Sequence, residues 1–127
     1  MPPTVKAALA YVLPVFALAF AFGVLRVTLI APRTGPLPAV ALELPLVLAL
    51  SWTVAGRVLA RWPDSRRADL GLIAFALLML LELATALALG QTPGQFLSAM
   101  ATPPGALGLA GQVGFGLVPL LRPQPRG

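Results

Sequence analysis

Three ionisable side chains, Arg26, Glu43 and Glu82, interrupt the long apolar stretches of this sequence. A charged side chain at the centre of a membrane-spanning helix costs about 2.5–3.5 kcal/mol, so each of these residues needs a partner or a purpose. An arginine paired with a glutamate can hold helices in register, whereas a glutamate that lacks a cation partner can carry a proton or bind a cation. The chemistry to expect is ion pairing or ion movement inside a membrane.

The residue content gives little support to other kinds of chemistry. The chain contains no His and no Cys, which excludes thiolate and imidazole metal sites and every nucleophile–base arrangement that depends on histidine. The sequence also lacks a phosphate-binding loop, a pair of exposed carboxylates and a cluster of metal ligands. We therefore predict that the protein is not an enzyme and binds no cofactor and no metal.

The composition requires a membrane. Of the 127 residues, 58% are hydrophobic and only 10% are charged, whereas a soluble domain carries about 25% charged residues. The net charge of +5 comes from nine basic residues dispersed among apolar runs, and these form no patch that could follow a phosphate backbone. We expect the lipid bilayer as the main partner and no binding of nucleic acid.

The elements that must position the charged residues are four membrane spans. About 20 apolar residues cross the ~30 Å hydrocarbon core of a bilayer, and the sequence divides at that spacing. The prediction is all-α: a polytopic four-helix transmembrane bundle with short loops, in one domain covering residues 1–127. The predicted spans are residues 7–31, 37–60, 70–89 and 103–121.

The first span has a second interpretation, a cleaved signal peptide. Small residues suited to cleavage lie at 17–19 and 19–21. The apolar run continues to Ala31, however, which is longer than the 7–15 residues typical of a signal peptide. An uncleaved span is therefore favoured.

Each span contributes one strong polar side chain at a similar depth. We count 1.5 Å of helical rise per residue from the ends of the spans that meet the first and third loops. This gives depths of roughly 9, 10, 12 and 13 Å below that membrane surface. The residues at these depths are, in order, Arg26, Glu43, Glu82 and Gln112. Unrelated residues are not expected to align in this way, and we predict that they form a buried layer in the outer half of the membrane.

This layer allows two interpretations. One arginine faces two carboxylates, so one negative charge is unmatched, and such a carboxyl tends to take up a proton in apolar surroundings. We expect Glu82, deep in the most apolar span, to hold that proton. In the structural interpretation, which is favoured, the layer fixes the helix register of a structural or accessory membrane subunit. The alternative is a small oligomeric proton-linked transporter or permease that uses the glutamates.

Gln112 shares its predicted helix face with three glycines, Gly105, Gly108 and Gly116. Small residues on one face let transmembrane helices approach closely. The pattern predicts tight packing along this face, either within the fold or between copies of the chain. A homo-oligomer or a larger membrane complex is therefore a further expectation.

The uncharged third loop carries the signature of a short helix. The segment Thr92-Pro93-Gly94-Gln95 fits a capping box, with Thr92 as N-cap, proline at the first helical position and Gln95 reaching back. Phe96, Leu97 and Met100 would form the apolar face of this helix, which we expect to lie at the membrane interface.

The basic residues predict the orientation of the chain. With four spans, most of them fall on one side, while the opposite side carries only Arg33. The positive-inside rule places that basic side, and with it both termini, in the cytoplasm. Its residues are Lys6, Arg57, Arg61, Arg66, Arg67, Arg122 and Arg126. Those flanking the second loop are also expected to contact anionic lipid head groups: Arg57, Arg61, Arg66 and Arg67.

Several short motifs resemble a known group of proteins. The order Arg-x5-Pro-Arg-x-Gly from Arg26, Glu-x-Pro from Glu43, a Ser-Trp stretch, and Glu-Leu from Glu82 is similar to short, functionally uncharacterised bacterial inner-membrane proteins with four predicted spans. This resemblance covers nearly the whole chain and implies a multi-pass protein of the bacterial inner membrane, without an activity. The small multidrug transporters are similar in length and span number. Their essential glutamate lies in the first span, where this chain offers only Arg26, which disfavours that assignment.

Overall fold

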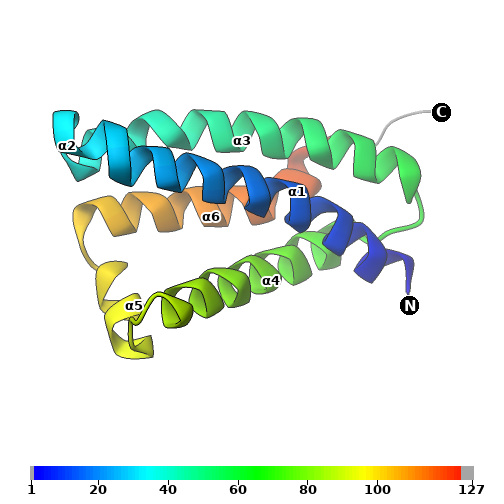
Figure 1. Cartoon of the computed structure of the whole chain (residues 1–127). Helices are drawn as coiled ribbons and strands as arrows, with labels where there is room; N and C mark the ends of the chain where they lie inside the picture. The colour runs from blue at the N-terminus through cyan, green and yellow to red at the C-terminus, as the bar shows by residue number, and fades with distance from the viewer. Residues whose placement is uncertain (1, 124–127) are drawn as a thin grey trace.

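Residues 2–123 are described by the structure, a computed structural model, and they form an all-α fold (Figure 1). Four helices in this part of the chain are long and apolar enough to cross a membrane, and a short fifth helix lies between the last two. The predicted fold class is therefore confirmed. Arg126, expected on the cytoplasmic side, lies outside the described residues. The elements are α1 (Pro3–Leu25), the π-helical segment η1 (Arg26–Ile30), α2 (Ala31–Thr34), α3 (Pro36–Arg61), α4 (Arg67–Ala88), α5 (Pro93–Ala99) and α6 (Pro103–Leu121).

The first span is longer than predicted because α1, η1 and α2 form one helix from Pro3 to Thr34. The predicted spans 7–31 and 37–60 leave residues 32–36 between them as a connecting turn, which is wrong: the helix continues through Pro32 to Thr34, and only Gly35, at φ 88°, interrupts it. A proline within a helix lacks an N–H and crowds the preceding turn. Here the turn before Pro32 is the π-helical η1, which is wider than an α-helical turn. Such a turn lets the helix continue past a residue that would otherwise interrupt it.

The four long helices pack in a ring whose order differs from their order in the chain. Helix α1 packs against α3 and α4, and α6 packs against the same two helices. The consecutive helices α3 and α4 are therefore not neighbours. Helices α1 and α4 lie close together near the N-terminus and separate toward the end of the bundle that carries α2 and α5 (Figure 1).

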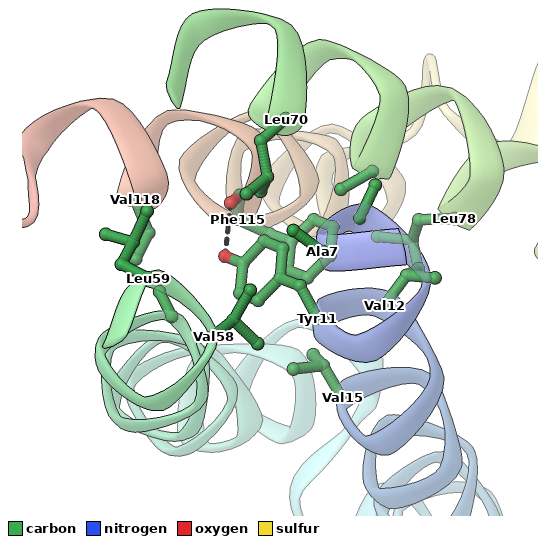
Figure 2. Close-up of a cluster of buried hydrophobic side chains, with 13 residues drawn as sticks. Ala7, Tyr11, Val12, Val15, Val58, Leu59, Leu70, Leu78, Phe115 and Val118 are labelled. Atoms are coloured by element: carbon green, nitrogen blue, oxygen red, sulfur yellow. Dashed lines mark hydrogen bonds between the residues drawn. The ribbon is translucent and has the colours of Figure 1, made fainter. Parts of the chain in front are cut away.

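The apolar core (Figure 2) lies at the end of this ring where Figure 1 shows the start of α1, the α3–α4 loop and the end of α6. We call this the closed end, and the end that carries α2 and α5 the open end. All four long helices contribute to the core. Its members are Ala7, Ala8, Tyr11, Val12, Val15, Ala55, Val58, Leu59, Leu70, Ala74, Leu78, Phe115 and Val118.

A stacked aromatic pair joins α1 to α6 across the closed end. The rings of Tyr11 and Phe115 are nearly parallel, with their centroids 4.3 Å apart, and the Tyr11 hydroxyl donates to the Phe115 backbone carbonyl (Figure 2). In a regular helix this carbonyl would accept from the N–H of residue 119, but Pro119 has none. Tyr11 therefore supplies the donor that Pro119 removes.

Glycines bring α4 and α6 into close contact beside this pair. A Cβ atom on Gly71 would overlap the carbonyl oxygen of Gly116, and one on Gly116 would lie 3.1 Å from the Cβ of Phe75. Of the glycines expected to pack, Gly116 thus lies in a helix contact. Gly105 instead lies against the Ala99 carbonyl, at the α5–α6 turn, and Gly108 has open space where a Cβ would be.

The short helix α5 begins with the predicted capping box. The Thr92 hydroxyl accepts from the backbone N–H of Gln95 at 3.1 Å, and the Gln95 side chain accepts from the backbone N–H of Thr92 at 2.9 Å. Two N–H groups at the start of the helix are thereby satisfied, which explains why a helix of seven residues forms here. The predicted short helix is confirmed, and its position at a membrane interface stays a prediction.

Candidate intramembrane binding site

A cavity of about 980 Å³ occupies the open end, between the four long helices and α5. The core side chains of Val15, Leu78 and Phe115 line it toward the closed end, and Phe96 and Met100 line it from the α5 segment. Its wall includes all members of the predicted polar layer: Arg26, Glu43, Glu82 and Gln112. The structure therefore brings the four residues to one site.

The first polar pair joins η1 to α3. Arg26 Nε lies 2.8 Å from Glu43 Oε2, so the two side chains form an ion pair, although the Nε–H is not aligned to donate a hydrogen bond to the carboxylate. Arg26 is the first residue of the π-helical segment, so the irregular turn of the first span begins at the residue that makes the ion pair. The pair links two helices that are consecutive in the chain and adjacent in the ring.

The second pair joins α4 to α6. The Gln112 side-chain nitrogen donates to Glu82 Oε2. The other end of the amide, Gln112 Oε1, is buried and accepts no hydrogen bond from residues 2–123. Within the same residues Glu82 makes no ion pair, although it interacts electrostatically with both Glu43 and Arg26. The charges of the first pair are therefore close enough to influence Glu82.

The prediction that this layer is buried is wrong. The side chains of Arg26 and Glu43 are 33% and 17% exposed, and those of Glu82 and Gln112 are also partly exposed. Because α1 and α4 separate toward the open end, apolar residues that could have sealed the layer remain half exposed; one of them is Phe20. The polar side chains consequently line the wall of a cavity.

The cavity wall is mainly apolar and carries an excess of negative charge. Glu43 and Glu82 contribute two carboxylates against the single guanidinium of Arg26, which leaves one negative charge when all three are ionised. Threonine hydroxyls on the wall donate to carbonyls of their own helices, as Thr28 does to Val24 and Thr85 to Leu81. Chemically, such a wall suits a molecule with a large apolar part and a small polar group.

The four arginines predicted to contact lipid head groups lie around the closed end, and they differ in exposure and in hydrogen bonding. The side chains of Arg57, Arg61 and Arg66 are exposed, and Arg61 lies over the ring of Trp62 at 5.1 Å. For these three, contact with head groups stays a prediction. Arg67 instead donates to the carbonyls of Pro119 at 2.8 Å, Leu120 at 2.6 Å and Arg122.

Arg67 therefore acts as a cap for α6. The last carbonyls of a helix have no partner within the helix, and a cation placed at that end satisfies them. This role was missed because sequence reasoning does not show that the start of α4 lies beside the end of α6. Arg122 was similarly missed: its guanidinium lies 5.0 Å from the centre of the Trp52 ring and against the backbone of Gly56.

No protein family, no curated protein and no solved structure matches this chain. The resemblance to short bacterial inner-membrane proteins accordingly extends only to the architecture. By helix length and hydropathy, the chain is a multi-pass membrane protein. Its role must be argued from the cavity and the polar side chains on its wall.

Proposed function

We propose that this chain is a non-enzymatic protein of the bacterial inner membrane that binds an amphipathic small molecule between its helices. The observation that carries the proposal is the position of the polar layer on the wall of a cavity of about 980 Å³. Sites for small molecules are typically concave and mostly apolar, with volumes of about 300–1,000 Å³ and a few convergent polar groups. The cavity at the open end has each of these properties.

Local backbone geometry supports a binding role. A π-helical turn lies next to the cavity and begins at Arg26. Such turns are rare, cost stability relative to a regular α-helix, and occur frequently at functional sites. If the polar residues served only to hold the helices together, we would expect closer packing around them, as at the closed end.

The two pairs contribute to helix register as well. The ion pair of Arg26 and Glu43 ties the first span to α3, and the hydrogen bond of Gln112 to Glu82 ties α4 to α6. The role of an accessory membrane subunit remains compatible with ligand binding. Assembly into a homo-oligomer or a larger complex stays a prediction, which the mass of the purified protein in nanodiscs would test. Cytoplasmic termini also stay a prediction, tested by reporter fusions to the C-terminus.

Saturable photolabelling would test the binding function. The purified protein in nanodiscs is exposed to a diazirine derivative of dodecanol, with and without excess dodecanol, and labelled residues are mapped by mass spectrometry. We expect labels on residues that line the cavity, suppressed by the competitor. Labels on the lipid-facing surface, for example at Leu72, which is 69% exposed, should not be suppressed.

Gly108→Phe provides the matched control variant. Nothing lies within 4 Å of a Cβ at this position, so the added ring can occupy the cavity without displacing a helix. The variant should keep its thermal stability and lose the suppressible labels. If labelling is insensitive to the competitor in the wild type, or identical in Gly108→Phe, the cavity is not a binding site.

Proton-linked transport of the bound molecule is the second candidate function. It is favoured by the position of Glu82 on the cavity wall, without an ion-pair partner among the residues described. Glu82→Gln removes the titratable group and preserves the shape of the side chain. Transport predicts a folded variant that loses pH-dependent flux in proteoliposomes, whereas binding without transport predicts that neither protein shows such flux.

A further inference from the structure

We infer that the cavity binds a protonated primary or secondary amine that carries an apolar chain, with its ammonium group beside Glu82. The inference rests on the proposed binding function and adds the chemical class of the ligand. Three observations lead to it: the charge of the wall, the unused hydrogen-bond acceptors and the apolar surface around them.

The charge of the wall selects a cation. Arg26 makes its ion pair with Glu43 at 2.8 Å, whereas Glu82 makes no ion pair among residues 2–123; its direct contact is the neutral amide of Gln112, and Arg26 attracts it only at longer range. One carboxylate charge therefore has no counter-ion at the site. Opposite charges in contact attract more strongly in these mainly apolar surroundings than in water, so a cation is favoured and a carboxylate ligand is opposed.

The unused acceptors select a cation that has N–H groups. A carboxylate only accepts hydrogen bonds. Among residues 2–123, the Glu82 carboxylate accepts one, at Oε2 from Gln112, so its second oxygen, Oε1, is left to accept from a ligand. A primary or secondary ammonium brings two or three donors together with its charge, whereas a quaternary ammonium brings the charge alone.

The remaining surface selects an apolar chain. Beyond the polar pairs the cavity is lined mainly by aliphatic and aromatic side chains, including Phe16 and Leu109. Phe20 and Val24 of α1 line the same cavity and are each 50% exposed, where α1 and α4 have separated. An alkyl chain held at its head by Glu82 can extend past these residues toward the lipid.

The test compares four competitors that share a dodecyl chain and differ in the head group. Labelling by the diazirine derivative of dodecanol is titrated with dodecylamine, dodecyltrimethylammonium, dodecanol or dodecanoate, and the amount of each competitor is expressed as its mole fraction in the bilayer to correct for partitioning. At pH 7 an amine with a pKa of about 10.4 is protonated. We expect dodecylamine to be effective at about tenfold lower mole fraction than dodecanol, the quaternary ion to fall between them, and dodecanoate to be weakest.

Two variants separate Glu82 from the other charges on the wall. Glu82→Gln should abolish the preference for dodecylamine over dodecanol and leave the suppression by dodecanol intact. The double variant Arg26→Gln/Glu43→Gln removes a complete ion pair, leaves the net charge of the wall unchanged, and should keep the preference. Circular dichroism and thermal stability in nanodiscs verify that both variants are folded.

The outcomes distinguish this inference from the proposed function. Saturable suppression in which dodecanol or dodecanoate equals dodecylamine overturns the amine and preserves the binding site. Equal competition by the quaternary ion and the primary amine overturns the need for N–H donors. Absence of saturable suppression with all four competitors overturns both the proposed function and the inference.

Discussion

At the closed end of the bundle the four helices meet around a continuous apolar core, and at the open end the same helices enclose a cavity of about 980 Å³. The closed end contains small residues where helices cross, such as Ala8, Gly71 and Gly116, and one aromatic stack. The open end contains the charged residues and a π-helical turn. Small residues thus let the helices pack closely at the closed end. This packing holds the bundle together although the helices are separated at the open end.

We expect most of the free energy of unfolding to come from contacts at the closed end. Substitutions there should be costly, and substitutions of similar size at the open end should be tolerated.

Gly71→Leu should have the largest effect. A Cβ here would overlap the carbonyl oxygen of Gly116, so α4 and α6 must separate. Overpacking within a core costs about 1–3 kcal/mol, and we expect the upper end or more because backbone is displaced. The measurement is thermal unfolding in detergent. Gly108→Leu is the control, because it adds the same side chain where nothing lies within 4 Å. Equal losses in the two variants would contradict the comparison.

Tyr11→Phe should cost about 1–3 kcal/mol, because it keeps the ring stack but leaves the Phe115 carbonyl without a donor. The carbonyl lacks a helical partner because residue 119 is proline. In a Pro119→Ala background, the alanine N–H can supply the missing bond, so Tyr11→Phe should cost much less there. A double-mutant cycle of unfolding free energies measures this coupling. If the two changes are additive, Pro119 does not explain the bond.

Arg67→Gln should destabilise the protein by about 1 kcal/mol, since the guanidinium donates to three carbonyls at the end of α6. The matched control is Arg66→Gln. That side chain is 83% exposed and lies 3.5 Å from Asp69, an exposed pair that is worth little. Thermal unfolding of both variants gives the comparison. A larger loss for Arg66→Gln would show that the cap is unimportant.

Arg26→Gln should have the smallest effect, of about 1 kcal/mol or less, because the ion pair that it breaks is partly exposed to the cavity. It leaves Glu43 without its cation, so the double variant Arg26→Gln/Glu43→Gln should be at least as stable as the single one. The unfolding free energies of the two variants test this order. A loss as large as that of Gly71→Leu would mean that the polar layer, and not the closed end, holds the bundle together.

Features encoded locally in the sequence could be predicted. Hydropathy gives the four spans, Thr92 and Gln95 give the capping box, and helical rise gives a common depth for Arg26, Glu43, Glu82 and Gln112. Each of these follows from residues within one helix or from the length of a helix, and needs no knowledge of how the helices cross.

Features that depend on how helices cross could not be predicted. The depth of a residue along its helix gives no information about the distance between two helices at that depth. The polar layer was therefore expected to be buried, although the helices are separated there. Gly108 and Gly116 have the same side chain on the same helix, yet only Gly116 faces a close neighbour. The role of Arg67 depends on the end of α6, which lies more than 50 residues away in sequence. These outcomes are decided by contacts at the closed end.

The order of the helices in the ring has a consequence for biosynthesis. Each intramembrane polar side chain finds its partner within its own helical hairpin, Arg26 with Glu43 and Glu82 with Gln112. A polar side chain that is already ion-paired or hydrogen-bonded costs less to bury in an apolar environment, so each hairpin can enter lipid with these side chains paired. The chain can therefore be released into the bilayer one hairpin at a time, with the α3–α4 loop letting the finished halves dock. A truncated chain that ends after α3 should insert stably.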